Sequence, residues 1–480
     1  MKKASALLLL IALLYALAGC GGSFPGSSNG GGVGGGVGSG NGNGGGGTNA
    51  GSTVGGGTSG GAGALHLSNG APVGTIYFTT NYGRTATEPG KDQLYAFRSD
   101  GSGRKLIAES VAASGATGLF FRTLSPDAKY IVYGTSGVNA DNQSAVLAKA
   151  DGSNKRTFVT GGYASDIAFT PDSQRMVYTS QSSSGSSRVA IVEGIDGSGQ
   201  RTITTGTYAT GTLAVVALTP DGTKLAAGGD NGLFVENLDG TGHVALVGTE
   251  FTVSELVFSR DGSKVAVTLN HRTDATKSGL YVLNADGSTN MATTMPLARA
   301  VPQVGNSFTH NEIIAEGWTP DGKVIFSTSE LVDNNTQVDF YEWFVMNPDG
   351  SGRQSLARWR PLGFDNIGDI GGGVLSPDKT KLAYSTGEIS IVSTAGGTPQ
   401  QLTNSDPGSN FQPTFNTDGT KICFISSRDD RGNVPGGEGG SGRGTLYIMN
   451  ADGTGQTRLI DGFSTDRPEA FRKVSIGGAR

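Results

Sequence analysis

The chain has little cysteine, little histidine and no excess of positive charge. Among its 480 residues are two cysteines, Cys20 and Cys423, and four histidines. Cys20 ends a signal-like segment, so a disulfide framework is excluded if Cys20 is modified. Lys and Arg number 36 against 41 Asp and Glu, with no basic cluster, which argues against nucleic-acid binding because that needs clustered cations. We expect Cys423, in an apolar run, to be a buried and inert thiol.

The N-terminus has the pattern of an export signal. Residues 1–20 begin with two lysines and continue with an apolar stretch that is too short for a comfortable transmembrane helix. Residues 17–20, Leu-Ala-Gly-Cys, resemble the bacterial lipobox, which implies that Cys20 is lipidated and becomes the mature N-terminus. We therefore predict a lipid-anchored extracytoplasmic protein of the cell membrane or outer membrane. The alternative is an ordinary secretory signal in which Cys20 is incidental.

Glycine is abundant, at 80 residues, and much of it lies in one block. Residues 21–63 are almost wholly Gly, Ser, Asn and Thr. Such a segment cannot bury apolar surface, so we expect a flexible tether with a root-mean-square reach of about 35–40 Å. The remainder, residues 64–480, has the composition of a globular domain rich in turns.

Two hairpin signals repeat along that remainder. In the first, an apolar strand, a Pro-Asp or Asp-Gly turn and a second apolar strand follow one another; its seven copies are centred on Asp127, Asp172, Asp221, Asp261, Asp321, Asp378 and Asp418. In the second, a strand ends in an Asp-Gly turn or a degenerate version of it; its eight copies begin at Asp100, Asp151, Asp196, Asp239, Asp286, Asp349, Ala395 and Asp452. Asp-Gly between apolar runs is a strong hairpin signal, since glycine tolerates a positive φ.

Two hairpins per unit predict four antiparallel strands, and a unit of this size fits a β-propeller blade. The first unit has no Pro-Asp strand before it, whereas residues 466–471 begin a strand with nothing after it. We infer that this C-terminal strand joins the N-terminal blade and closes the ring, which removes free sheet edges. The prediction is an all-β propeller of eight blades, with seven as the alternative.

The repeats, from about residue 74 to residue 475, resemble those of TolB-like or WD-repeat-like propellers, which share the Ser/Thr-Pro-Asp-Gly turn and a later Asp-Ala-Asp-Gly hairpin. The resemblance implies a fold and is nearly silent on function. In a four-stranded meander the two short turns lie at one end of the blade. The long connections therefore share the opposite face, where we expect function to concentrate.

Candidate chemistry is sparse. The turn aspartates, such as Asp127, Asp172 and Asp221, are expected to accept hydrogen bonds from their own backbone rather than to act as acids or ligands. The reactive-looking residues of the long-loop face are His310, Glu312, Glu316, Asp365 and Asp369. They could bind a divalent metal or act as acid and base, or be ordinary solvated polar groups, since no recognised ligand spacing is present.

Aromatic and arginine residues cluster near the same units. Trp359, Arg358, Arg360 and Tyr341 are predicted to contact a partner, because these side chain types dominate binding interfaces. The last strand of that unit is expected to end near Leu356, which would place Trp359 and Arg358 in a connection on the long-loop face. The alternative is that the tryptophans pack between blades.

Two functions stay open from the sequence. One is a membrane-anchored scaffold without catalytic residues or cofactors, which binds an envelope protein or glycan and not nucleic acid. The other is a metal-dependent polysaccharide lyase or hydrolase with its site on the long-loop face. The two differ in whether the histidine and carboxylates of that face converge on one pocket.

Overall fold

The strands arise from short apolar runs bounded by turn residues. The structure is a computed structural model that describes residues 75–476 except 83–90, 101, 112–117, 137–143, 161, 183–187, 204–212, 300–312, 331–339, 361–372, 406–408, 417, 429–444 and 460–468. The described residues all belong to the unit Ala64–Arg480. The middle strands of a blade are buried almost throughout, as in Lys224–Gly229, because another blade covers each face of the sheet.

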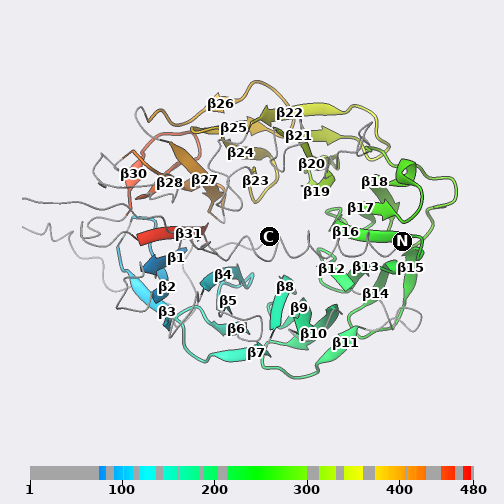
Figure 1. The fold of residues 1–480 in the computed structure, drawn as a ribbon, viewed down its shortest axis with the longest axis horizontal. Helices are drawn as coiled ribbons and strands as arrows, with labels where there is room; N and C mark the ends of the chain where they lie inside the picture. The colour runs from blue at the N-terminus through cyan, green and yellow to red at the C-terminus, as the bar shows by residue number, and fades with distance from the viewer. Residues whose placement is uncertain are drawn as a thin grey trace, which may run out of the picture. The chain divides into compact units, whose positions relative to one another are not determined.

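Eight antiparallel sheets follow one another around a central axis (Figure 1), which confirms the eight-bladed propeller. Blade 1 contains β1 (Ile76–Tyr82), β2 (Lys91–Phe97), β3 (Lys105–Val111) and β31 (Glu469–Ile476). Blade 2 contains β4 (Gly118–Leu124), β5 (Tyr130–Ser136), β6 (Ser144–Lys149) and β7 (Arg156–Thr160). Blade 3 contains β8 (Gly162–Phe169), β9 (Arg175–Ser182), β10 (Arg188–Gly194) and β11 (Arg201–Ile203). Blade 4 contains β12 (Leu213–Leu218), β13 (Lys224–Gly229), β14 (Gly232–Asn237) and β15 (Val244–Val247).

Blade 5 contains β16 (Phe251–Phe258), β17 (Lys264–His271) and β18 (Gly279–Asn284), with the 3-10 helix η2 (Ala275–Lys277) between the last two. Blade 6 contains β19 (Ile313–Trp318), β20 (Val324–Glu330), β21 (Phe340–Met346) and β22 (Gln354–Trp359). Blade 7 contains β23 (Val374–Leu375), β24 (Lys381–Ser385), β25 (Ile389–Ser393) and β26 (Gln400–Gln401). Blade 8 contains β27 (Asn410–Phe415), β28 (Lys421–Ser426), β29 (Thr445–Asn450) and β30 (Thr457–Arg458).

Blade 5 departs from the four-stranded prediction. Its outer position is held by an irregular segment that pairs with β18 only where Leu280 faces Ala298. A turn at Asn290, whose carbonyl accepts from the amides of Thr293 and Thr294, diverts the chain before that bridge. The fourth strand is therefore replaced by a single bridge.

The C-terminal strand lies in the N-terminal blade, since β31 pairs antiparallel with β1 from Ile76↔Ile476 to Tyr82↔Glu469. In the part of the chain that the structure describes, buried apolar side chains form eight clusters, each between two neighbouring blades. One of them joins blades 8 and 1, with Cys423 and Ile425 packed against Phe78. That β31 stabilises the whole ring stays a prediction.

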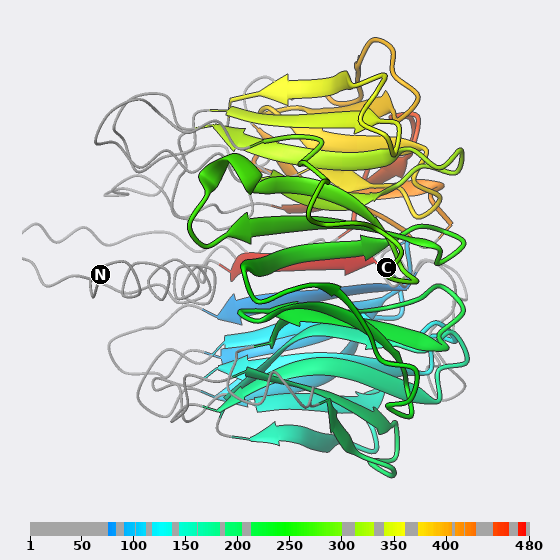
Figure 2. The same ribbon diagram turned by 90° about the vertical axis from the view of Figure 1, so that its right-hand side faces the viewer.

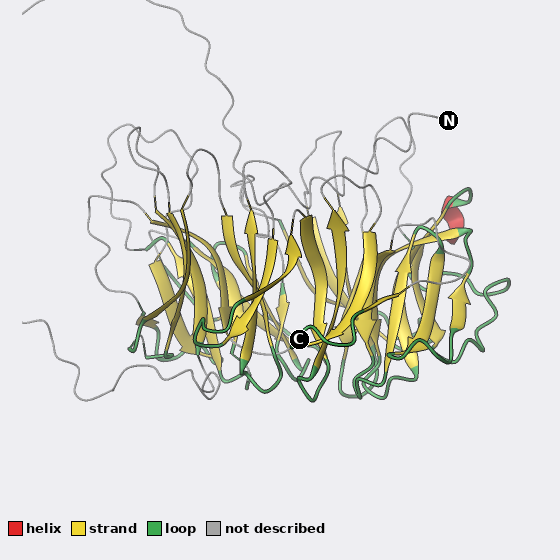
Figure 3. Ribbon diagram, turned by 90° about the horizontal axis from the view of Figure 1, so that it is seen from below, coloured by secondary structure: helices red, strands yellow, loops and turns green. Residues whose placement is uncertain are grey.

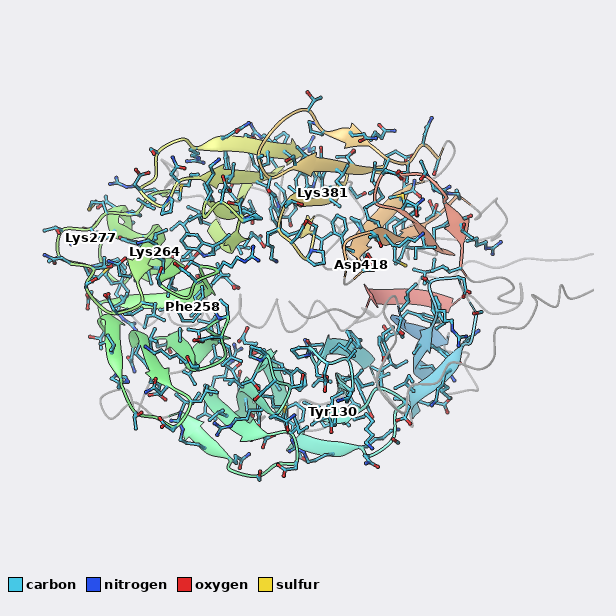
Figure 4. The ribbon with its side chains drawn as sticks, turned by 180° about the vertical axis from the view of Figure 1, so that it is seen from behind. Tyr130, Phe258, Lys264, Lys277, Lys381 and Asp418 are labelled. Carbon is cyan, nitrogen blue, oxygen red and sulfur yellow. The ribbon has the colours of Figure 1, made fainter. Side chains whose placement is uncertain are left out.

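The short turns lie along one face of the ring (Figures 2 and 3), here called the turn face. The opposite face is called the loop face. In the first turn of each of blades 2 to 8, a buried Ser, Thr or Asn side chain accepts a hydrogen bond from the backbone N–H that starts the next strand. In blade 3, for example, the Thr170 hydroxyl accepts from the Arg175 amide at 3.0 Å and donates to Asp172 at 2.6 Å. Lys264 and Lys381, which follow such turns, are labelled in Figure 4.

The glycine of the second turn also fits one blade against another. Gly152 has φ +82°, and a Cβ atom there would lie 2.6 Å from the carbonyl oxygen of Ile107 on the preceding blade. The corresponding glycines of the later blades are also directly against the preceding blade: Gly197, Gly240, Gly287, Gly350, Gly396 and Gly453. Only glycine allows both the turn and the close approach.

Candidate functional site

The turn aspartates hold their own backbone, as the sequence predicted. Asp127, Asp172 and Asp221 each accept a hydrogen bond from the amide two residues on, at 3.0–3.1 Å. Such bonds lower the pKa of these carboxyl groups; at Asp261, hydrogen bonds from Ser259 and Ser263 lower the pKa to about 2. These aspartates are structural residues of the turn face.

Cys423 is also as predicted. Its side chain is 0% exposed between blades 8 and 1, and burial raises the pKa of its thiol. A buried thiol that stays protonated is neither a nucleophile nor a metal ligand. Cys20 lies outside the described residues, and no helix of the described part is long and apolar enough to span a bilayer.

Most of the candidate metal ligands lie outside the residues that the structure describes. His310, Glu312, Asp365 and Asp369 lie in the residues that the structure does not describe. Glu316 is described: it lies in β19, and its carboxylate accepts a hydrogen bond from Ser327 at 2.6 Å. Among the described residues no three His, Cys, Asp or Glu side chains gather as a metal site.

The expected position of Trp359 is wrong. β22 continues to Trp359 instead of ending near Leu356, so Arg358 and Trp359 both belong to the strand and not to the connection. It is 4% exposed and stacks on Tyr384 of blade 7, with ring centroids 4.6 Å apart. Trp343 is similarly buried in the same cluster. Both tryptophans therefore pack between blades 6 and 7, the alternative that the sequence left open.

The neighbours of Trp359 reach the surface at the loop-face end of blade 6. Arg358 lies 3.8 Å from Glu342, and its guanidinium lies over the Phe340 ring, 4.4 Å from the centroid. The Arg358 side chain is 47% exposed, Tyr341 is half-buried against Trp359, and Arg360 is exposed. We call Phe340, Tyr341, Glu342, Arg358 and Arg360 the blade-6 corner. It presents a fixed cation beside aromatic surface.

A second feature lies on the innermost strands, which carry β-bulges. β4 has one extra residue at Arg122, β16 at Ser254 and β19 at Glu316, each opposite a regular neighbouring strand. Comparable register shifts interrupt the pairing of β8, β12, β27 and β31. A bulge redirects a side chain and bends its strand, and such irregularities are frequent beside functional sites.

Three of these bulges contain polar residues, namely Arg122, Asp166 and Gln412. Asp166, at φ +49°, accepts a hydrogen bond from the buried Thr179 hydroxyl at 3.1 Å. Although Arg122 is exposed to solvent, desolvation by the surrounding protein lowers its pKa, and the negative charge of Asp166 opposes this shift. Gln412, at φ +53°, has a buried side-chain oxygen without a hydrogen-bond partner. Sequence reasoning missed this feature, because one extra residue in a strand leaves no mark in composition or spacing.

Comparison with known proteins shows the fold alone. No family model matches the chain, and no curated protein matches it. An oligogalacturonate lyase in complex with manganese is 11% identical, over 79% of this chain and 98% of that one, with a TM-score of 0.44. The dihydro-heme d1 dehydrogenase NirN is 12% identical, over 86% and 75%, with a TM-score of 0.49. TolB from Acinetobacter baumannii is 15% identical, over 83% and 82%, with a TM-score of 0.33. At such low identity no function transfers.

Proposed function

We propose that this chain is a lipid-anchored, extracytoplasmic binding scaffold of the bacterial envelope, and that the blade-6 corner contacts its partner, an envelope protein or a glycan. One observation carries the choice of site. Arg358 is half-exposed, and its guanidinium lies over the Phe340 ring with the Glu342 carboxylate beside it. A cation that is fixed before binding loses little side-chain entropy when a partner arrives.

The anchor rests on the sequence. Residues 1–20 combine a charged start, an apolar stretch and the lipobox-like Leu-Ala-Gly-Cys, and residues 21–63 supply a tether. Cys20 would carry the lipid, and several acyl chains would hold the protein at the membrane, where a single chain binds only weakly.

Fractionation tests the anchor. The Cys20→Ser variant should leave the membrane fraction, and metabolic labelling with a palmitate analogue should mark the wild-type chain and not the variant. A variant that remains membrane-bound, with wild-type protein unprocessed, would show that the apolar segment itself is the anchor.

A pull-down from envelope extract and from purified envelope glycan tests the site. Arg358→Ala should reduce capture of the partner by about tenfold or more, as for a binding hot spot near 2 kcal/mol. Arg353→Ala is the matched control: Arg353 also lies over an aromatic ring, Phe344 at 4.1 Å, but at the turn-face start of β22. Equal capture by both variants and the wild type, with normal melting temperatures, would remove the blade-6 corner as the binding site.

A further inference from the structure

Arg428 lies two residues beyond β28 of blade 8, and three neutral oxygen atoms accept its side-chain N–H groups. Its Nε donates to the Ser426 hydroxyl at 2.8 Å, and its terminal nitrogens donate to Gln456 Oε1 and Asn410 Oδ1, each at 3.0 Å. The guanidinium carbon lies over the Tyr447 ring, 4.5 Å from the centroid. Ser426 and Asn410 are both 0% exposed, so the cation is held by groups of the protein interior.

Contacts with blade 7 decide which end of each amide faces Arg428. The Gln456 amide nitrogen donates to the carbonyl oxygen of Leu402 at 3.0 Å, which directs its own oxygen toward the guanidinium. The Asn410 amide nitrogen donates to the Glu388 carboxylate at 2.6 Å, so the Asn410 oxygen also faces the cation. Both acceptors are therefore oriented before a ligand arrives, which reduces the entropy lost on binding.

The charge of Arg428 distinguishes it from three other arginines. Arg156, Arg201 and Arg358 lie 2.9, 2.9 and 3.8 Å from a glutamate carboxylate, which offsets their positive charge. Within the described ranges no ion pair joins Arg428 to a carboxylate. Amide and hydroxyl oxygens accept hydrogen bonds but carry no net charge, so among these residues Arg428 has no direct counter-charge. Arg428 is half-buried and Gln456 is exposed, so solvent reaches the cation.

The N–H groups that remain suit a carboxylate. A guanidinium has five N–H groups in one plane, of which Ser426, Gln456 and Asn410 use three, so two are left for a ligand. A planar carboxylate accepts charge-assisted hydrogen bonds from such a group. The Glu388 carboxylate lies on the far side of the Asn410 amide and would repel a second negative charge on the ligand. A singly charged anion therefore fits better than a doubly charged one.

We infer that Arg428, positioned by Asn410 and Gln456, binds a carboxylate group on blade 8. The site is separate from the proposed function, since neither Cys20 nor the blade-6 corner contributes to it. Failure of the blade-6 corner to capture a partner would therefore leave this inference intact, and the reverse also holds.

Sodium acetate is the probe for the site. The Arg428 Nε–H resonance of the wild-type protein, identified by its loss in Arg428→Lys, is followed by NMR while acetate replaces chloride at constant ionic strength. The resonance should shift and saturate with a dissociation constant on the order of 10–100 mM, as expected for one charge-assisted pair. Sodium sulfate should bind more weakly.

Arg353 is the control within the same sample, because its guanidinium also lies over an aromatic ring, that of Phe344 at 4.1 Å. Its Nε–H resonance should show no saturable shift. An Arg428 resonance that does not shift or does not saturate, or a saturable shift of equal affinity at Arg353, would overturn the site. Tighter binding of sulfate than of acetate would overturn the assignment to a carboxylate.

Gln456→Glu tests the role of charge directly. It puts a carboxylate where the wild type has a neutral oxygen 3.0 Å from Arg428, so acetate should bind about tenfold more weakly or not at all. Thr457→Glu adds the same charge at the adjacent exposed position and should weaken binding by about twofold at most. Unchanged acetate affinity in a folded Gln456→Glu variant would contradict the inference. If that variant fails to fold, the wild-type titration decides alone.

Discussion

The two faces of the ring are built in different ways. On the turn face the same short-range bonds recur: Thr219 and Asp221 satisfy amides two and five residues away in blade 4. On the loop face the described contacts include a polar junction between blades 7 and 8. Asn410, 0% exposed, donates to Glu388 at 2.6 Å and accepts from Arg428 at 3.0 Å, so it joins segments far apart in the chain. The turn face thus repeats one local motif, whereas this loop-face junction depends on residues from separate strands and blades.

The largest loss of stability is expected from the removal of β31, the C-terminal strand that completes blade 1. Deletion of residues 464–480 removes β31 and exposes the edge of β1, so the ring should unfold at least about 5 °C lower or lose its cooperative transition. Deletion of residues 477–480 alone keeps β31 and is the control. An unchanged melting temperature in the longer deletion would contradict the role of this strand.

At the loop-face end of blade 6, Trp359→Ala should lower the free energy of unfolding by about 3–5 kcal/mol, because a buried ring that stacks on Tyr384 is lost. Urea denaturation measures it. Trp359→Phe keeps a stacked ring and should lose clearly less free energy of unfolding than Trp359→Ala. A loss below about 1 kcal/mol for alanine would mean that the stack contributes little to stability.

The next largest loss of stability is expected at the polar junction of blades 7 and 8. Asn410→Ala leaves the Glu388 carboxylate short of one donor and Arg428 short of one acceptor, so unfolding should require about 2–3 kcal/mol less. Asn347→Ala is the matched control, since Asn347 makes one exposed bond to Ser351 on the turn face and should change stability by less than about 0.5 kcal/mol. Similar losses for the two variants would remove the contrast between the faces.

Gly222 and Gly322 have the same position in the first-turn motif. Substituting each by alanine distinguishes the energetic cost of the turn geometry from the cost of packing between blades. Both have positive φ, at +69° for Gly222 and +82° for Gly322. A Cβ atom at Gly222 would lie 2.3 Å from the Pro171 ring, whereas at Gly322 nothing lies within 4 Å. Gly322→Ala should cost about 1 kcal/mol for its backbone alone. Gly222→Ala should cost roughly 1–2 kcal/mol more by urea denaturation, because a proline ring cannot move aside easily.

The smallest effect per residue is the stability that each turn aspartate loses in acid. The turn aspartates have a folded pKa below their ordinary value of 3.8, so the stability they contribute is present above about pH 4 and is lost as pH falls toward the folded values, near pH 2 for Asp261. The urea midpoint should therefore fall between pH 4 and pH 2. Asp261→Asn should make that fall shallower; the same slope in the variant and the wild type would show that this turn does not contribute.

The sequence was a good guide to whatever depends on nearby residues. The turn roles of Asp172 and Asp221 and the burial of Cys423 could be predicted because the responsible groups lie within one hairpin or one apolar run. The sequence placed Trp359 beyond the end of its strand, whereas β22 continues to this residue. A difference of a few residues in strand length decides whether a side chain lies in a connection or packs between blades. The bulges at Arg122 and Glu316 left no signal, since register is a property of two paired strands.

The sequence by itself determined that this chain is a propeller of four-stranded blades, with eight preferred over seven, because apolar runs and Asp-Gly turns set strands and hairpins through bonds a few residues long. Only the tertiary structure decided what each side chain meets. Glycines such as Gly152 fit against the preceding blade, Trp359 stacks on Tyr384, and the buried Glu236 accepts a hydrogen bond from Arg201. These contacts join residues tens of positions apart, and the distance between such residues is fixed only when neighbouring blades pack.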